Sequence, residues 1–143
     1  GIKQICAHIE QFPYPHLFLS AIHQAGGSAG LSLNLKTPVT MLEPYARNVD
    51  FVLFVSVEAD FEGLPFRPSI LKKIQEARSF LPKETRIWVD GGINMENLPL
   101  VIEAGADAVV MGRAIFENPN PKSAWQHYQS LGASLRQERE KGV

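Results

Sequence analysis

The chain has 143 residues, 45% of them hydrophobic and 20% charged, with a formal net charge of −1. This length predicts one domain with a hydrophobic core, spanning residues 1–143, and the near-neutral charge argues against a nucleic-acid partner or an anionic membrane surface. No apolar run is long enough for a membrane-spanning helix, no signal peptide is visible, and a single cysteine excludes a disulfide within the chain. We therefore expect a cytoplasmic protein.

Short apolar runs alternate with helical patterns along the chain. The predicted strands are Ile2–Ala7, Ala29–Asn34, Phe51–Val57, Arg86–Val89 and Ala108–Met111. The predicted helices are Tyr14–Ala25 (stopped by Gly26 and Gly27), Pro38 to about Asn48, one that opens at Pro68, Asn94–Ala104 (closed by Gly105), a short turn over Gly112–Phe116, and a charged helix from about Pro121 to near the end. The mixed-charge tail Arg136–Lys141 is expected to be a solvated helix face that frays. Strands that alternate with helices form parallel sheets with right-handed crossovers, so the sequence predicts an α/β fold.

One predicted turn joins a carboxylate to two glycines. An apolar run ends at Asp90, and Gly91 and Gly92 follow at once; the next apolar run is followed by Gly112. Glycines allow backbone N–H groups to approach an anion closely, and the N-terminus of a helix adds the positive end of its dipole. Since the carboxyl ends of parallel strands meet at one face, the sequence predicts a phosphate site formed by these glycines beside Asp90 as an acid/base group.

Each of these residues also has a purely structural interpretation. Asp90 could be a turn former, and Gly91 and Gly92 could simply make a tight turn. Arg113 could add positive charge to a phosphate site or face solvent, and the sequence favours neither. His8, at a predicted strand end, could be an active-site neighbour, but a core histidine bonded to a neighbouring carbonyl is slightly favoured. The sequence contains no complete cluster of His, Cys, Asp and Glu with metal-ligand spacing.

Five successive strand ends resemble the ribulose-phosphate 3-epimerase family of phosphosugar barrels. The matching segments are Ala7–Glu10, Gly30–Pro38, Val52–Val57 with Phe61, Gly63 and Phe66, Val89–Ile93, and Met111–Phe116. The resemblance implies that the chain is the C-terminal portion of a TIM (β/α)8 barrel, strands four to eight. It implies an isomerase that epimerises a ketose phosphate, a pentulose or hexulose phosphate, through an enediolate with the help of a divalent metal ion (Zn, Fe, Mn or Co). Asp90 would be both a proton-transfer group and a metal ligand, and Gly63 would contact the phosphate.

The resemblance is incomplete in two respects. The family's other metal ligands and its second proton-transfer carboxylate have no counterpart here, so the chain alone is expected to be inactive. Asp60 and Glu62 stand where the family has glycines, and acids repel a phosphate, which leaves the identity of the sugar open.

A five-stranded part of a barrel also has two open edges and an apolar inner face. We therefore expect a homo-oligomer or association with the N-terminal half of a barrel. The alternatives to an epimerase are a non-catalytic phosphosugar-binding protein and a structural half-barrel fragment.

Overall fold

Five parallel strands form one sheet whose order in space, β1-β2-β3-β4-β5, is their order in the chain. The strands are β1 (Gln4–His8), β2 (Ser28–Leu33), β3 (Phe51–Val55), β4 (Arg86–Asp90) and β5 (Ala108–Val110). The helices are η1 (Ile9–Gln11), α1 (Pro15–Gln24), η2 (Val39–Tyr45), α2 (Ser69–Phe80), α3 (Leu98–Glu103), α4 (Arg113–Phe116) and α5 (Pro121–Lys141). This is a computed structural model, and it describes residues 1–58 and 64–142. The predicted α/β fold of five parallel strands with alternating helices is confirmed.

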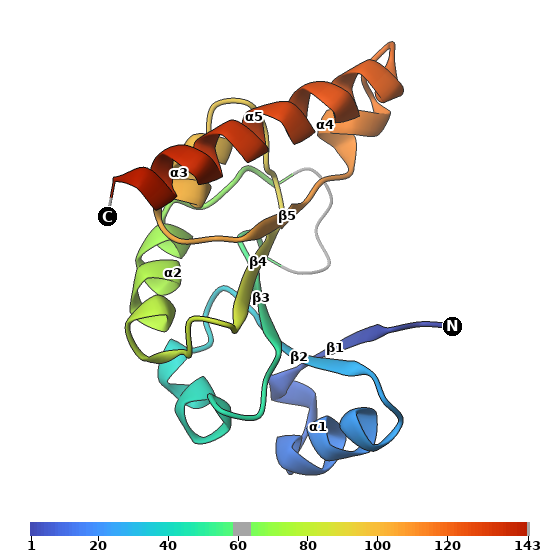
Figure 1. Cartoon of the computed structure of the whole chain (residues 1–143), viewed down its shortest axis with the longest axis vertical. Helices are drawn as coiled ribbons and strands as arrows, with labels where there is room; N and C mark the ends of the chain where they lie inside the picture. Colours follow the sequence, from blue (N-terminus) through green and yellow to red (C-terminus); the bar gives the residue numbers. More distant parts are fainter. Residues whose placement is uncertain (59–63, 143) are drawn as a thin grey trace.

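The hydrophobic core lies between the sheet and the helices that follow its strands (Figure 1). Leu31, Phe54 and Val89, from three neighbouring strands, are fully buried against side chains such as Leu19 of α1 and Ile74 of α2. Strand side chains alternate between faces, so the residues between these positions point to the opposite, inner face of the sheet. No helix within the described ranges has the length and apolar character needed to cross a membrane.

The inner face carries the side chains that a closed barrel would enclose. Phe51 stacks on Trp88 of the neighbouring strand, with ring centroids 4.9 Å apart. Asp90 lies two residues beyond Trp88 and therefore shares its face, at the carboxyl end of β4. Val110, paired with Asp90, remains 40% exposed. The face that bears the predicted acid/base group is thus only partly covered.

Two helix ends follow the predicted glycine stops. Gly26 has φ +77° and Gly105 has φ +119°, a left-handed conformation that favours glycine. After α1, the Gly27 N–H donates to the Ile22 carbonyl at 3.0 Å, and the Gly26 N–H donates to the His23 carbonyl at 2.9 Å. These two hydrogen bonds satisfy carbonyl groups that the helix end would otherwise leave without a donor.

Two predicted helices differ from the expected ones because of prolines. The helix expected from Pro38 to about Asn48 is instead the short 3-10 helix η2, which contains Pro44. The helix expected from Asn94 begins only at Leu98, with Pro99 in its first turn. Proline lacks an N–H and its ring clashes with the carbonyl four residues earlier, so it is accommodated in a first turn or a tighter helix rather than in an α-helix interior.

The expectation of a solvated face at the end of α5 is confirmed except at Arg139, which is half-buried, whereas the other residues of Arg136–Lys141 are exposed and the helix continues to Lys141. The Arg139 guanidinium donates to the carbonyls of Ile102 and Ala106 at 3.0 and 2.8 Å, and it lies 3.2 Å from the Asp107 carboxylate. Arg78 of α2 reaches the same carboxylate at 2.5 Å. Arg139 therefore fastens α5, and Arg78 fastens α2, to Asp107 in the loop before β5, which joins segments far apart in the sequence.

Candidate active site

A cavity of about 960 Å³ lies at the carboxyl ends of β4 and β5. It is lined by five of the predicted site residues, Asp90, Gly91, Gly92, Gly112 and Arg113. The fold therefore brings together predicted residues from two successive strand ends. Its other walls come from Val57, Leu64, Pro65, Phe66, Pro68, Ile93, Asn94, Glu96, Asn97, Leu100, Val110, Met111, Ala114 and Glu117. Gly63, also expected to contact the phosphate, lies outside the described residues.

Asp90 is the last residue of β4 and is half-buried. Burial raises the pKa of its carboxyl above the ordinary value, and the hydrogen bond from the Gly91 N–H offsets only part of this effect. A carboxyl with a raised pKa holds a proton more readily near neutrality, which is the property a proton-transfer group needs.

The Gly91-Gly92 turn has a geometry that requires glycine. Gly91 has φ +113° and Gly92 has φ +63°. A side chain at Gly92 would place its Cβ 2.8 Å from the Phe66 backbone nitrogen, and one at Gly91 would come within 2.9 Å of a Val57 methyl. The turn therefore presents bare backbone to the cavity for both conformational and steric reasons.

Two buried side chains that sequence reasoning missed hold this turn. Ser56, directly after β3, is fully buried, and its hydroxyl contacts the carbonyl oxygens of Asp90 and Gly91. Asn97, 7% exposed, donates to the Gly92 carbonyl at 2.9 Å. The one sequence signal was Ser56 itself, a polar residue inside the otherwise apolar run Phe51–Val57.

Gly112 and Arg113 form the opposite wall. Gly112 has no neighbouring heavy atom within 4 Å of a built Cβ, so the space beside it is open. Arg113, at the first position of α4, is exposed and is the only cationic side chain among the residues that line the cavity in the described part of the chain. Glu96 and Glu117 also line it, so two further carboxylates oppose the attraction that Arg113 offers to an anion.

His8 does not belong to this cavity. It ends β1, at the other end of the sheet from β4 and β5. The slightly favoured interpretation as a core histidine bonded to a carbonyl is wrong: the side chain is 38% exposed, and its Nδ1 lies 3.4 Å from Glu10 Oε2 without a hydrogen-bond partner among the described residues. The imidazole is therefore partly exposed, although its Nδ1 atom is buried.

The described residues around Asp90 do not complete a metal site. Within residues 1–58 and 64–142, no three His, Cys, Asp or Glu side chains lie close enough to hold a metal ion. Stable metal sites use three or four protein ligands, whereas Asp90 offers one carboxylate. The described residues therefore do not by themselves fit a divalent metal.

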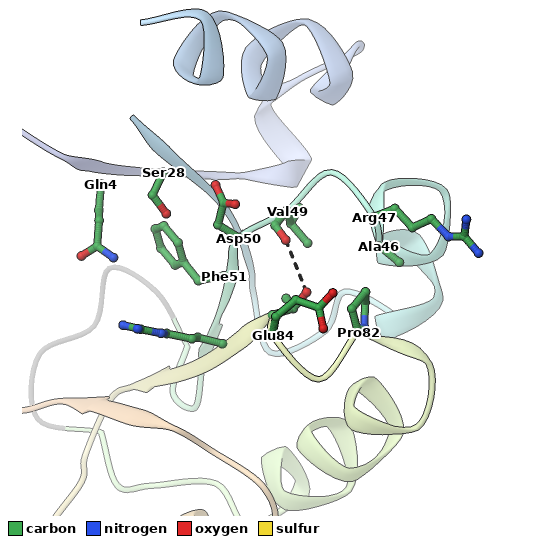
Figure 2. A pocket seen from close by; sticks show the side chains of 11 residues that line it. Gln4, Ser28, Ala46, Arg47, Val49, Asp50, Phe51, Pro82 and Glu84 are labelled. Carbon is green, nitrogen blue, oxygen red and sulfur yellow. Dashed lines mark hydrogen bonds between the residues drawn. The ribbon is translucent and has the colours of Figure 1, made fainter. Parts of the chain in front are cut away.

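A smaller cavity of about 370 Å³ lies at the amino end of the sheet (Figure 2). Its lining residues include Gln4, Ser28, Asp50, Phe51 and Glu84. In parallel barrels the amino ends of strands contribute to stability, whereas the carboxyl ends carry the chemistry. The cavity beside Asp90 is therefore the candidate active site.

Known proteins of similar sequence show the family of this chain. A sequence model described as the ribulose-phosphate 3-epimerase family matches residues 1–116. Ribulose-phosphate 3-epimerase of Bacillus subtilis is 38% identical over 128 residues, which cover 87% of this chain and 59% of the relative. The Escherichia coli K12 protein of the same name is 33% identical over 141 residues, covering 96% of this chain and 63% of the relative.

A solved structure supports the same fold. The crystal structure of a 3-hexulose-6-phosphate synthase superposes with a TM-score of 0.71 at 18% identity, over 91% of this chain and 62% of that one. At this identity the likeness shows the fold alone, that of part of a TIM barrel. The chain spans between 53% and 59% of the length of its first three curated relatives. With the family match covering most of its length, the chain belongs to the ribulose-phosphate 3-epimerase family.

Proposed function

We propose that this chain contributes the phosphate-binding turn and one proton-transfer carboxylate to a ketose-phosphate 3-epimerase site. The observation that carries the proposal is that Asp90, with its raised pKa, adjoins a glycine turn open to the same cavity. The curated relatives bear the name of an epimerase that acts on ribulose phosphate, which supports a phosphorylated ketose as the substrate.

The chemistry follows from the position of Asp90. A carbon next to a ketone loses a proton to a carboxylate, and the resulting enediolate regains a proton on its opposite face from a second group. The Gly91 N–H already bonds the Asp90 carboxyl, so the backbone N–H groups of Gly92 and of the segment after Gly112 would hold the phosphate, with Arg113 adding positive charge. Metal assistance, which family membership implies, would need ligands beyond those that the described residues provide.

A second part of the proposal is that the site works within a larger assembly. The surface of 8822 Å² exceeds the roughly 7,400 Å² that a compact monomer of 15.9 kDa exposes. Large apolar side chains are exposed beside both sheet edges: Ile5 and Leu17 near β1, and Val110, Phe116 and Trp125 near β5. We infer that a second copy or the remaining βα units of a barrel cover these edges. Size-exclusion chromatography with light scattering would contradict this if the chain stayed a well-behaved monomer at about 50 μM, well above the Kd of a stable complex.

A coupled epimerase assay with ribulose 5-phosphate and added divalent metal tests the activity. The chain alone is expected to be inactive, and mixing it with the N-terminal portion of the Bacillus subtilis relative is expected to produce turnover. The same mixture with Asp90→Asn is the control and should lack turnover. Full activity of the chain alone would refute the need for further groups, and binding of the sugar phosphate without turnover in the mixture would favour the phosphosugar-binding alternative.

A further inference from the structure

Three successive carbonyl groups of the glycine turn are held by two buried side chains. The Ser56 hydroxyl lies 2.9 Å from the Asp90 carbonyl oxygen and 2.5 Å from that of Gly91. The Asn97 side-chain amide donates to the Gly92 carbonyl at 2.9 Å. The backbone N–H of Ser56 also donates to the Asp90 carbonyl, at 2.8 Å.

The direction of each carbonyl fixes the direction of the next N–H. In a trans peptide unit the C=O and the N–H of the following residue point in opposite directions, and the described residues contain no cis peptide bond. A Gly91 carbonyl that faces Ser56 therefore turns the Gly92 N–H away from Ser56. In the same way, a Gly92 carbonyl that faces Asn97 turns the Ile93 N–H away from Asn97.

These two N–H groups remain available to a ligand. Gly92 and Ile93 both line the cavity beside Asp90. Within the described part of the chain, neither N–H donates a hydrogen bond. Successive N–H groups that converge in such a turn form a concave site for an anion.

The side chains of Ser56 and Asn97 are themselves held in place by their surroundings. Ser56 is fully buried at the end of β3, where the pairing of Val55 with Asp90 places it next to the turn. The Oδ1 atom of Asn97 accepts a hydrogen bond from the Asn94 N–H at 2.9 Å. Because both polar atoms of the Asn97 side chain are bonded, its amide group cannot rotate freely. The two side chains satisfy the carbonyls from within the protein and leave the cavity side of the turn to the N–H groups.

We propose that Ser56 and Asn97 are positioning residues that aim the N–H groups of Gly92 and Ile93 at the phosphate of the substrate. The inference rests on the proposed phosphate site, and it adds what orients that site. Neither side chain needs to touch the phosphate, because each acts through a carbonyl of the turn.

The test combines the orientation of the N–H vectors with the binding of inorganic phosphate. Residual dipolar couplings of the Gly92 and Ile93 amides would be compared in wild type, Ser56→Ala, Ser56→Thr and Asn97→Asp. Inorganic phosphate would be titrated while the same amide signals are followed. Thr85→Val is the matched control, because Thr85, directly before β4, is buried, and among the described residues its hydroxyl bonds only the Val49 carbonyl, at 3.4 Å.

We expect Ser56→Ala to reorient the Gly92 N–H and to weaken phosphate binding by about tenfold, the effect of one lost hydrogen bond. Ser56→Thr keeps the hydroxyl and should restore both properties, whereas Thr85→Val should change neither. Asn97→Asp keeps the Oδ1 acceptor but loses the amide donor, and it should reorient the Ile93 N–H. Unchanged N–H vectors in Ser56→Ala and Asn97→Asp would overturn the positioning roles, whereas a wild-type chain that does not bind phosphate would overturn the proposed phosphate site.

Discussion

The Ser56 hydroxyl lies 2.5 Å from the carbonyl oxygen of Gly91, and this contact joins the end of β3 to the turn that follows β4. The parallel pairing of Val55 with Asp90 brings the two residues together although 35 positions separate them in the chain. Since Ser56 is fully buried, the contact ties the sheet register to the shape of the candidate active site. A change in either strand end is therefore expected to affect both stability and binding.

Gly92→Ala should destabilise the protein and weaken phosphate binding. The substitution forces a side chain into φ +63° and places its Cβ 2.8 Å from the backbone nitrogen of Phe66, which cannot move as a flexible side chain can. We expect a loss of about 1–3 kcal/mol in the free energy of unfolding, measured by urea denaturation. Gly132→Ala is the control: it lies within α5 with open space around it, and it should stabilise by about 0.5–1 kcal/mol. Equal effects of the two substitutions would contradict the role assigned to the turn.

Asp90→Asn should become progressively more stable than wild type as the pH rises. Burial raises the folded-state pKa of Asp90 above its ordinary value of 3.8, so the folded state opposes ionisation and wild type loses stability as the carboxyl ionises above that pH. Asparagine stays neutral and escapes this loss. Urea denaturation of both proteins between about pH 4 and pH 7 measures the difference. A difference that does not grow with pH would show that Asp90 is not held in the protonated form by burial.

Glu10→Gln should have the opposite pH dependence. Burial alone would raise the pKa of Glu10, but hydrogen bonds from the Thr37 hydroxyl and the Asn34 N–H, with a smaller contribution from His8, lower it below the ordinary value. The ionised carboxylate therefore stabilises the folded state above the unfolded pKa, and this contribution is lost as the pH falls through the folded pKa. The stability gap between wild type and Glu10→Gln should be largest near neutral pH and should narrow in acid. A gap that widens in acid would contradict this assignment.

Asp107→Ala should loosen the C-terminal end of α5, which Arg139 still holds through the Ile102 and Ala106 carbonyls. The Asp107 side chain is 18% exposed and accepts from Arg78, Arg139 and the Ile87 N–H, so its removal leaves three donors without their acceptor. We expect a loss of about 2 kcal/mol or more in the free energy of unfolding, together with faster amide exchange around Arg139. Glu103→Ala, an exposed position on α3, should stay within about 0.5 kcal/mol of wild type. Unchanged exchange in α5 would show that its end is held by other contacts.

The sequence alone predicted the five parallel strands and, of the cavity lining, Asp90, Gly91, Gly92, Gly112 and Arg113. The apolar run Phe51–Val57 and the stops at Gly26 and Gly105 are local signals, because hydrophobic periodicity and a left-handed glycine depend on neighbours in the chain. Asp90, Gly91 and Gly92 were found in the same way, since a carboxylate and two glycines directly after a buried strand are visible without a structure. Their convergence with Gly112 followed from the rule that the carboxyl ends of parallel strands share one edge.

Only the tertiary structure decided what surrounds and supports these residues. The contacts of Ser56 with Gly91, of Asn97 with Gly92 and of Arg139 with Asp107 depend on strand register and on the approach of helices, which local patterns do not encode. The raised pKa of Asp90 likewise depends on burial by the cavity walls, and the partial exposure of His8 reflects its place at the end of an edge strand, which has a neighbour on one side only. The sequence by itself therefore determined which groups stand at the strand ends, whereas long-range packing determined how those groups are oriented, buried and charged.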